Sequence, residues 1–144
     1  MINKKYPALR SIIEADMANI TPDEHQFGID VTLNITQPGE RKYKHGPRVK
    51  IFRENPDINF SVALNKDFKE PKIIGNPYKV IRRKDLAPLL QEIQKYRIPF
   101  LMFWYDRTMS TSKLLKLMQR SDNGESLEKE LEALLDKNRL TPSA

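Results

Sequence analysis

The sequence has no cysteine, only two histidines and five scattered glycines, and these absences remove several functions. Without cysteine there is neither a disulfide framework nor thiolate chemistry, which fits a reducing compartment. The histidines, His25 and His45, have no partner at metal-ligand spacing, so we expect no metal site. No Gly-rich phosphate loop is present, and nucleotide binding lacks a motif. We therefore expect no metal and no cofactor.

Long apolar runs are also missing. The longest, Phe100–Tyr105, is far too short to cross a bilayer, and the first residues lack an apolar stretch of signal-peptide length. We expect a soluble, cytoplasmic protein without a membrane partner. With 39% hydrophobic and 31% charged residues among 144, the composition is that of one globular domain.

Charge is distributed unevenly along the chain. The formal net charge is +6, but residues 41–53 alone carry +6 with no acid among them, and residues 82–120 carry a further +6. Residues 1–40 and 121–144 are each acidic, with a balance of −3. Basic blocks of this kind are typical of proteins that bind a polyanion.

Hydrophobic spacing predicts an α+β fold in one domain. Leu9, Ile12, Ile13 and Met17 recur at helical spacing and predict an N-terminal helix over residues 7–19. Strict alternation from Phe27 to Thr36 predicts a half-buried strand. Turn residues then separate this strand from others, so we expect an antiparallel meander of four strands. The remaining strands are expected at Arg48–Arg53, at Ile58–Asn65, and as a broken edge strand at Lys72–Gly75 and Tyr78–Arg82.

Helices are expected to follow the sheet. Asp85 is a suitable N-cap for a helix that ends near Arg97, with Pro88 in its first turn. Phe100–Tyr105 is apolar on every side and fits a buried strand or a core helix; the proline before it and its aromatic rings favour a fifth strand. Two more helices are expected after Ser110 and Ser126. The change of charge at residues 121–125 divides the chain into a domain of residues 1–120 and an acidic C-terminal helix, residues 121–144, packed on it.

The basic strand is the first candidate site. In Arg48–Arg53, Val49 and Ile51 face one side of the sheet, and the cationic and aromatic side chains face the other. Cations release counterions from phosphates and rings stack on bases, so this face suits a nucleic acid, either DNA or RNA. A solvated strand with a basic loop explains the same pattern. The expected contact residues are Arg41, Lys42, Tyr43, Lys44, His45, Arg48, Lys50 and Phe52.

A second candidate precedes the second helix. Arg82, Arg83 and Lys84 place three cations beside the free amides of a helix start, which is a plausible phosphate site. A solvated helix entry explains them equally well. The helix–sheet–helix order resembles the topology of double-stranded-RNA-binding domains, which also place basic residues at the start of the helix after the sheet. The strand–strand–helix portion resembles small single-stranded-DNA-binding coactivators. Neither resemblance includes a matched motif, so neither assigns site residues.

Three functions follow from these patterns. The first is a non-catalytic nucleic-acid-binding module. The second is a small interaction factor, an inhibitor or adaptor encoded by a phage or mobile element, that binds an acidic surface of a host protein. The third uses His45 as a general base at a phosphodiester, but no carboxylate cluster accompanies it, so we expect no catalytic residues. The aromatic segment around Trp104 is expected in the core, with a homodimer or target interface as the alternative.

Overall fold

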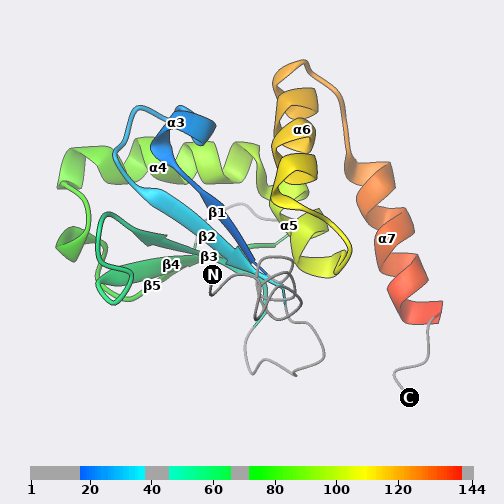
Figure 1. The fold of residues 1–144 in the computed structure, drawn as a ribbon, viewed down its shortest axis with the longest axis horizontal. Coiled ribbons are helices and arrows are strands. Elements are labelled where there is room, and N and C mark those ends of the chain that lie inside the picture. The colour runs from blue at the N-terminus through cyan, green and yellow to red at the C-terminus, as the bar shows by residue number, and fades with distance from the viewer. Residues whose placement is uncertain (1–16, 38–45, 66–71, 141–144) are drawn as a thin grey trace, which may run out of the picture.

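The computed structural model describes residues 17–37, 46–65 and 72–140, with side chains described as far as residue 137. It is an α+β fold in which a five-stranded antiparallel sheet is followed by helices (Figure 1). The elements are β1 (Met17–Ile20), α3 (Pro22–His25), β2 (Thr32–Thr36), β3 (Arg48–Phe52), β4 (Asn59–Ala63), β5 (Ile73–Ile74), the 3₁₀ helix η1 (Pro77–Lys79), α4 (Arg83–Lys95), α5 (Arg97–Tyr105), α6 (Thr111–Asp122) and α7 (Glu128–Leu140).

The sheet is a meander, because each strand pairs with its neighbours in sequence in the order β1-β2-β3-β4-β5. The predicted α+β fold and antiparallel meander are confirmed, but the sheet has five strands, not four. The additional strand is β1, so the predicted helix was wrong over residues 17–19; residues 7–16 lie outside the described ranges. Ala18 and Ile20 are fully buried and pair with Ile35 and Leu33, and this burial outweighs the helical spacing.

Alternation along the strands divides the sheet into two faces. Leu33, Val49, Ile51 and Val62 are completely buried on one face, which we call the inner face. The strand register places these buried residues side by side, since Leu33 lies opposite Ile51, and Ile51 lies opposite Phe60. The residues between them form the outer face, where the side chains of β2 and β3 are partly exposed and Ser61 of β4 is buried. The predicted division of the Phe27–Thr36 pattern into a buried and a polar side is confirmed, but the predicted strand was wrong over residues 27–31, because β2 begins only at Thr32. Gly28, with a φ of +78°, and the bond from the Val31 N–H to the Ile29 carbonyl turn the chain there.

Helices α4, α5 and α6 pack on the inner face. Leu89, Ile93, Phe100 and Leu114 join the same buried cluster as the inner-face strand residues. In Figure 1, α4 lies above the sheet and α7 lies at the end of the molecule farthest from β5. None of the helices in the described part of the chain is long and apolar enough to span a membrane.

The segment predicted as a possible fifth strand, residues 100–105, is instead most of helix α5. The helix begins at Arg97, two residues before Pro99, and its N-cap is Tyr96. Pro99 therefore falls in the first turn, where its missing N–H would have had no helical partner. The Phe100 N–H makes the first helical bond, to the Tyr96 carbonyl at 3.0 Å. Every residue from Ile98 to Trp104 is buried, which explains the absence of a polar stripe.

Two further boundaries differ from the prediction. Helix α4 begins at Arg83 with Arg82 as N-cap, so Asp85 is not the cap and Pro88 lies inside the helix. There Pro88 cannot donate the bond that the Lys84 carbonyl would accept. The strand predicted at Tyr78–Arg82 was also wrong, because the chain forms the 3₁₀ helix η1 there. Asn76 caps this helix by accepting a hydrogen bond from the Tyr78 N–H at 3.0 Å.

Gln37 joins the end of β2 to the C-terminal end of α5. Its side chain is 1% exposed, and Nε2 donates to the carbonyl oxygens of Phe103 at 3.0 Å and Asp106 at 2.5 Å. These carbonyls belong to the end of α5 and the turn after it, where helical partners run out. A buried amide in this position therefore fixes the sheet to the helix layer.

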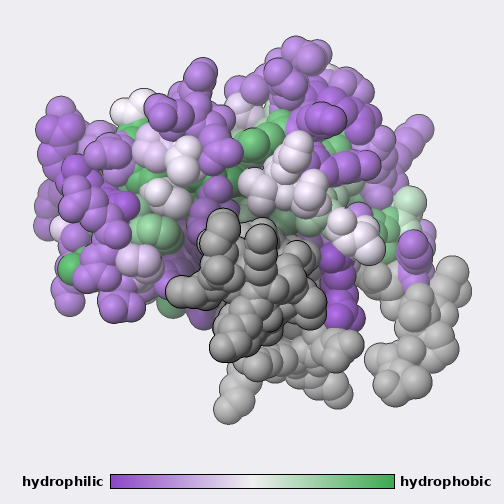
Figure 2. Space-filling view, viewed as in Figure 1, coloured by the Kyte–Doolittle hydropathy of each residue, from purple (hydrophilic) through white to green (hydrophobic). Residues whose placement is uncertain are grey.

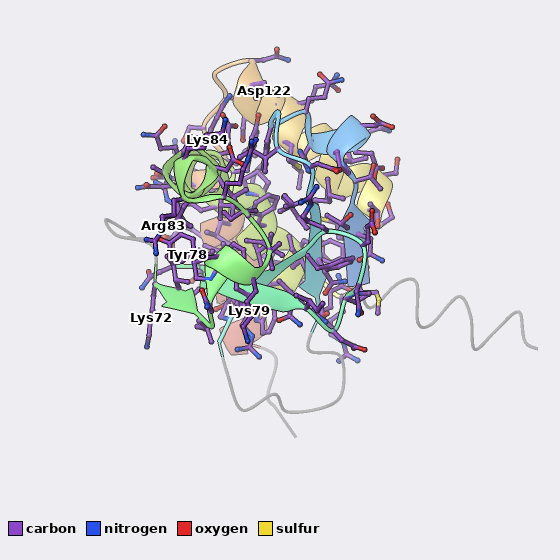
Figure 3. All side chains as sticks on the ribbon, turned by 90° about the vertical axis from the view of Figure 1, so that its left-hand side faces the viewer. Lys72, Tyr78, Lys79, Arg83, Lys84 and Asp122 are labelled. Carbon is purple, nitrogen blue, oxygen red and sulfur yellow. The ribbon has the colours of Figure 1, made fainter. Side chains whose placement is uncertain are left out.

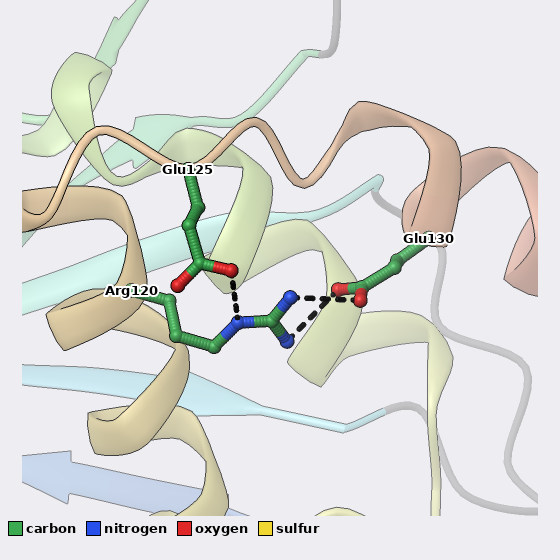
Figure 4. Close-up of polar contacts among 3 residues, drawn as sticks. All are labelled: Arg120, Glu125 and Glu130. Carbon is green, nitrogen blue, oxygen red and sulfur yellow. Dashed lines mark hydrogen bonds and ion pairs between the residues drawn. The ribbon is translucent and has the colours of Figure 1, made fainter.

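Helix α7 is held by apolar packing and one ion-pair cluster. Leu127 and Leu131 are 2% and 0% exposed, and α7 contacts α5. Arg120 of α6 donates from Nη1 and Nη2 to the Glu130 carboxylate at 3.2 and 2.9 Å, and from Nε to Glu125 at 3.1 Å (Figure 4). Helix α6 begins as predicted, with the Ser110 hydroxyl accepting from the Lys113 N–H.

Candidate nucleic-acid interface

The outer face carries the cations of β3 among uncharged strand residues. Arg48, Lys50 and Phe52 alternate with the buried Val49 and Ile51 and so lie on the face of the sheet opposite to the buried cluster. The register places uncharged residues beside them. Lys50 lies between Asn34 and Ser61, Phe52 lies between Thr32 and Asn59, and Arg48 lies opposite Ala63. The neighbours of Arg48, Lys50 and Phe52 on the adjacent strands are thus small and uncharged.

A hollow of about 260 Å³ opens on this face. Among the described residues its lining contains two cations, the Trp104 ring of α5 and no carboxylate: Asn34, Thr36, Arg48, Lys50, Asn59, Ser61 and Trp104. Arg48 and Lys50 form no ion pair with an acid in the described ranges. A hollow with cations, hydroxyls and amides and no acid is electrostatically suited to an anion.

Phe52 is half-buried on the outer face. The helix residues of the buried cluster pack against the inner face, on the other side of the sheet. The Lys50 ammonium lies 6.0 Å from the centre of its ring, at the outer limit of a cation–π contact. Phe52 is therefore an apolar side chain among polar neighbours at one end of the cationic row.

A second group of cations gathers at the β5 side of the sheet. We call it the basic edge, and it consists of Lys72, Tyr78, Lys79, Arg83 and Lys84. The five residues come from three segments: the approach to β5, the helix η1, and the first turn of α4. All five are exposed, and Figure 3 shows them on the side of the molecule that faces the viewer. The same end of the molecule, at the left of Figure 2, is largely hydrophilic.

The cations of the basic edge are not paired with the acids that the structure describes. Lys72, Lys79, Arg83 and Lys84 form no ion pair with the acids in the ranges that the structure describes. The Arg83 guanidinium lies over the Tyr78 ring, with Cζ 4.3 Å from the ring centre. Tyr78 is 44% exposed in this position. The edge therefore combines four exposed cations with one exposed aromatic ring.

The basic edge and the outer face are continuous. The Ala63 N–H donates to the Lys72 carbonyl at 2.9 Å, and Arg48 lies opposite Ala63 on the other side of β4. Arg48 and Lys72 thus occupy one row across the sheet with a single small residue between them. Adjacent strands are about 4.8 Å apart, so the two backbones are separated by about 10 Å.

The other predicted residues divide into two groups. Arg82 is exposed, but its Nε contacts the Asp85 carboxylate at 3.4 Å, so its charge is partly compensated and it stands apart from Arg83 and Lys84. The loop residues Arg41, Lys42, Tyr43, Lys44 and His45 lie outside the described residues.

Sequence reasoning missed Lys72, Tyr78 and Lys79. They are single residues in a segment whose net charge is zero, so no charge block marked them. The Asn76-Pro77 pair could have indicated them, since it turns the chain at the edge of the sheet and places the following residues beside the start of α4.

A cavity of about 620 Å³ lies between α3, α4 and α6 and is separate from these surfaces. Two of its charged residues, Lys95 and Asp122, are paired with each other. Tyr96 donates its hydroxyl hydrogen to the Asp122 carboxylate, and Lys95 Nζ lies 3.0 Å from the same group. The Tyr96 hydrogen bond lowers the pKa of Asp122, and burial raises the pKa of Tyr96. Among the described residues no three His, Asp or Glu side chains are grouped so that they could hold a metal ion.

His25 borders that cavity as a neutral structural residue. Its Nδ1 accepts from the Phe27 N–H at 3.0 Å, so Nε2 carries the proton and donates to the Val31 carbonyl at 2.7 Å. The side chain is 6% exposed, and burial lowers its pKa below 6.5, opposed by the Val31 bond and by Glu24 and Glu92.

Stability is therefore expected to depend on His25 under mildly acidic conditions. The unfolded chain takes up the proton at higher pH than the folded chain, so the free energy of unfolding falls as the pH drops from about 6.5 towards the lowered pKa. A His25→Gln variant should lose this pH dependence even if its stability at neutral pH is lower. Urea unfolding at a series of pH values measures both. An equal pH slope in the two proteins over that window would contradict the assignment.

Comparisons with known proteins found no relative of this chain. No protein family matches the chain, and no curated protein or solved structure is significantly similar to it.

Proposed function

We propose that the protein is a non-catalytic nucleic-acid-binding module. The observation that carries the proposal is the basic edge, where four cations from three segments surround an exposed tyrosine and make no ion pair with a described acid. Solvated cations grouped on one side release counterions from a phosphate backbone, which supplies most of the affinity of sequence-independent binding. An ordinary solvated surface would more often interleave acids with these bases.

The outer face supports the same proposal. Arg48 extends the cations of the basic edge across the sheet along the row that contains Lys72, and Lys50 lies two residues further along β3. The uncharged residues around them would bring no repulsion to a phosphate chain. A strand of nucleic acid crossing β5 and β4 would then contact six cations: Arg48, Lys50, Lys72, Lys79, Arg83 and Lys84.

Salt dependence tests the proposal directly. Six phosphate contacts to a single strand predict a slope of about −4 for log affinity against log salt concentration, or a loss of roughly 250-fold between about 50 and about 200 mM salt. Fluorescence anisotropy with a labelled mixed-sequence oligonucleotide measures the slope. The absence of binding at the lowest salt concentration would refute the proposal and favour an acidic protein partner. Binding that is insensitive to salt would refute it as well.

A further inference from the structure

Tyr78 is held in place while its ring remains exposed. Pro77 beside it is buried, and the Asn76 side chain accepts the Tyr78 N–H, so the backbone of η1 is anchored to the domain. The ring is 44% exposed, and the Arg83 guanidinium lies against it at 4.3 Å. Among the described residues, the other large hydrophobic side chains with comparable exposure are Ile58 and Ile74, and neither has an aromatic ring that could stack on a base.

An aromatic ring among cations has a specific use in nucleic-acid binding. Every base has a flat face that stacks on a tyrosine, and a guanidinium on the ring adds a cation–π contact and orients it. In a duplex the base faces are covered by their neighbours and only phosphates and groove edges are accessible. A single strand can offer its bases to the ring while its phosphates meet the flanking lysines.

We propose that Tyr78, oriented by Arg83, is a base-stacking platform and that the ligand is single-stranded nucleic acid. The inference rests on the proposed function and adds the strandedness of its ligand. Lys72, Lys79 and Lys84 come from segments on different sides of the ring and contact the phosphates next to the stacked base. For the stacked base, Arg83 is a positioning residue, because it acts on the base through the tyrosine ring, and its charge also contributes to binding of the phosphate backbone.

Substitution of Tyr78 separates stacking from charge. Tyr78→Ser is expected to weaken binding of a single-stranded oligonucleotide by about 5- to 150-fold, the range for the loss of one stacked base. Tyr78→Phe keeps the ring and should bind like the wild type. Arg83→Lys keeps the charge without the planar group and should fall between them. A duplex of the same sequence should bind Tyr78→Ser and wild-type protein equally.

A single-stranded oligonucleotide with abasic sites provides a second measurement. It retains the phosphates but lacks the bases, so the wild type should bind it more weakly than the intact strand, and Tyr78→Ser should lose little more. Thermal melting of each variant confirms folding. Equal single-strand affinity of Tyr78→Ser and wild type would overturn this inference, and so would tighter binding of duplex than of single strand. Neither result affects the proposed function, which fails only if wild-type protein binds no nucleic acid or binds it without salt dependence.

Discussion

A Lys72→Glu/Lys79→Glu/Lys84→Glu variant is expected to bind nucleic acid about a hundredfold more weakly than the wild type at low salt. Three phosphate contacts are removed, and three carboxylates repel the remaining backbone. The salt slope should become shallower by about 2, since each lost contact to a single strand contributes about 0.7. Anisotropy titrations at several salt concentrations measure both effects. Folding should be preserved, because all three side chains are exposed and Glu at position 84 suits the first turn of α4.

A matched variant controls for net charge. Lys113→Glu/Lys116→Glu/Lys129→Glu changes three exposed lysines of α6 and α7, and it lowers the formal charge by the same amount. These helices lie at the opposite end of the molecule from β5 (Figure 1). The control should retain most of the affinity. If both variants lost affinity equally, the binding would depend on total charge and not on the basic edge.

Replacement of Phe100 with alanine is expected to lower the free energy of unfolding by about 3–5 kcal/mol. The ring is 0% exposed in α5, the helix that contacts β2, α6 and α7, so a cavity there would disturb both layers of the fold. Domains of this size have free energies of unfolding of about 5–15 kcal/mol, so the loss is a large share of the total. Urea denaturation measures it.

Ile58→Ala provides the comparison for Phe100. Ile58 is 49% exposed in the turn before β4, and shortening it should change the free energy of unfolding by about 0.5 kcal/mol or less. A cost below about 1 kcal/mol for Phe100→Ala would show that α5 is not the buried centre of the helix layer.

The parts of the fold that the sequence could predict are those with a decisive local pattern. The residues from Phe27 to Thr36 alternate strictly, and their predicted faces match the burial observed in β2. Ser110 marks the start of α6 because a serine cap and a leucine stripe agree. The order of the strands follows from short turns that leave few ways to connect them.

Where the prediction failed, distant contacts decide the structure. The four residues of β1 are too few to show a period, and only their pairing with β2 makes them a strand. Residues 98–104 are buried on every side, so no polar stripe could identify α5 as a helix. The role of Gln37 depends on carbonyl groups at least 66 residues away, which no local pattern contains.

The candidate site was predictable on the sheet and only in part at its edge, where Arg83 and Lys84 were predicted and Lys72, Tyr78 and Lys79 were not. Arg48, Lys50 and Phe52 form a regular strand, so their shared face follows from alternation alone. The basic edge combines Lys72, Tyr78 and Arg83, which come together only after β5 and η1 have formed. Net charge counted along the chain overlooks such a cluster.

The shortness of β5 limits how a partner could approach this side. Sheets that end in a long unpaired strand invite the addition of a foreign strand through backbone hydrogen bonds. Here the edge strand has two residues, and Gly75, with a φ of +96°, and Pro77 interrupt the chain directly after it. Lys72 precedes it, and a lysine beside an edge strand discourages further pairing. β-Augmentation and edge-to-edge aggregation are therefore disfavoured at this edge, and recognition there depends on side chains.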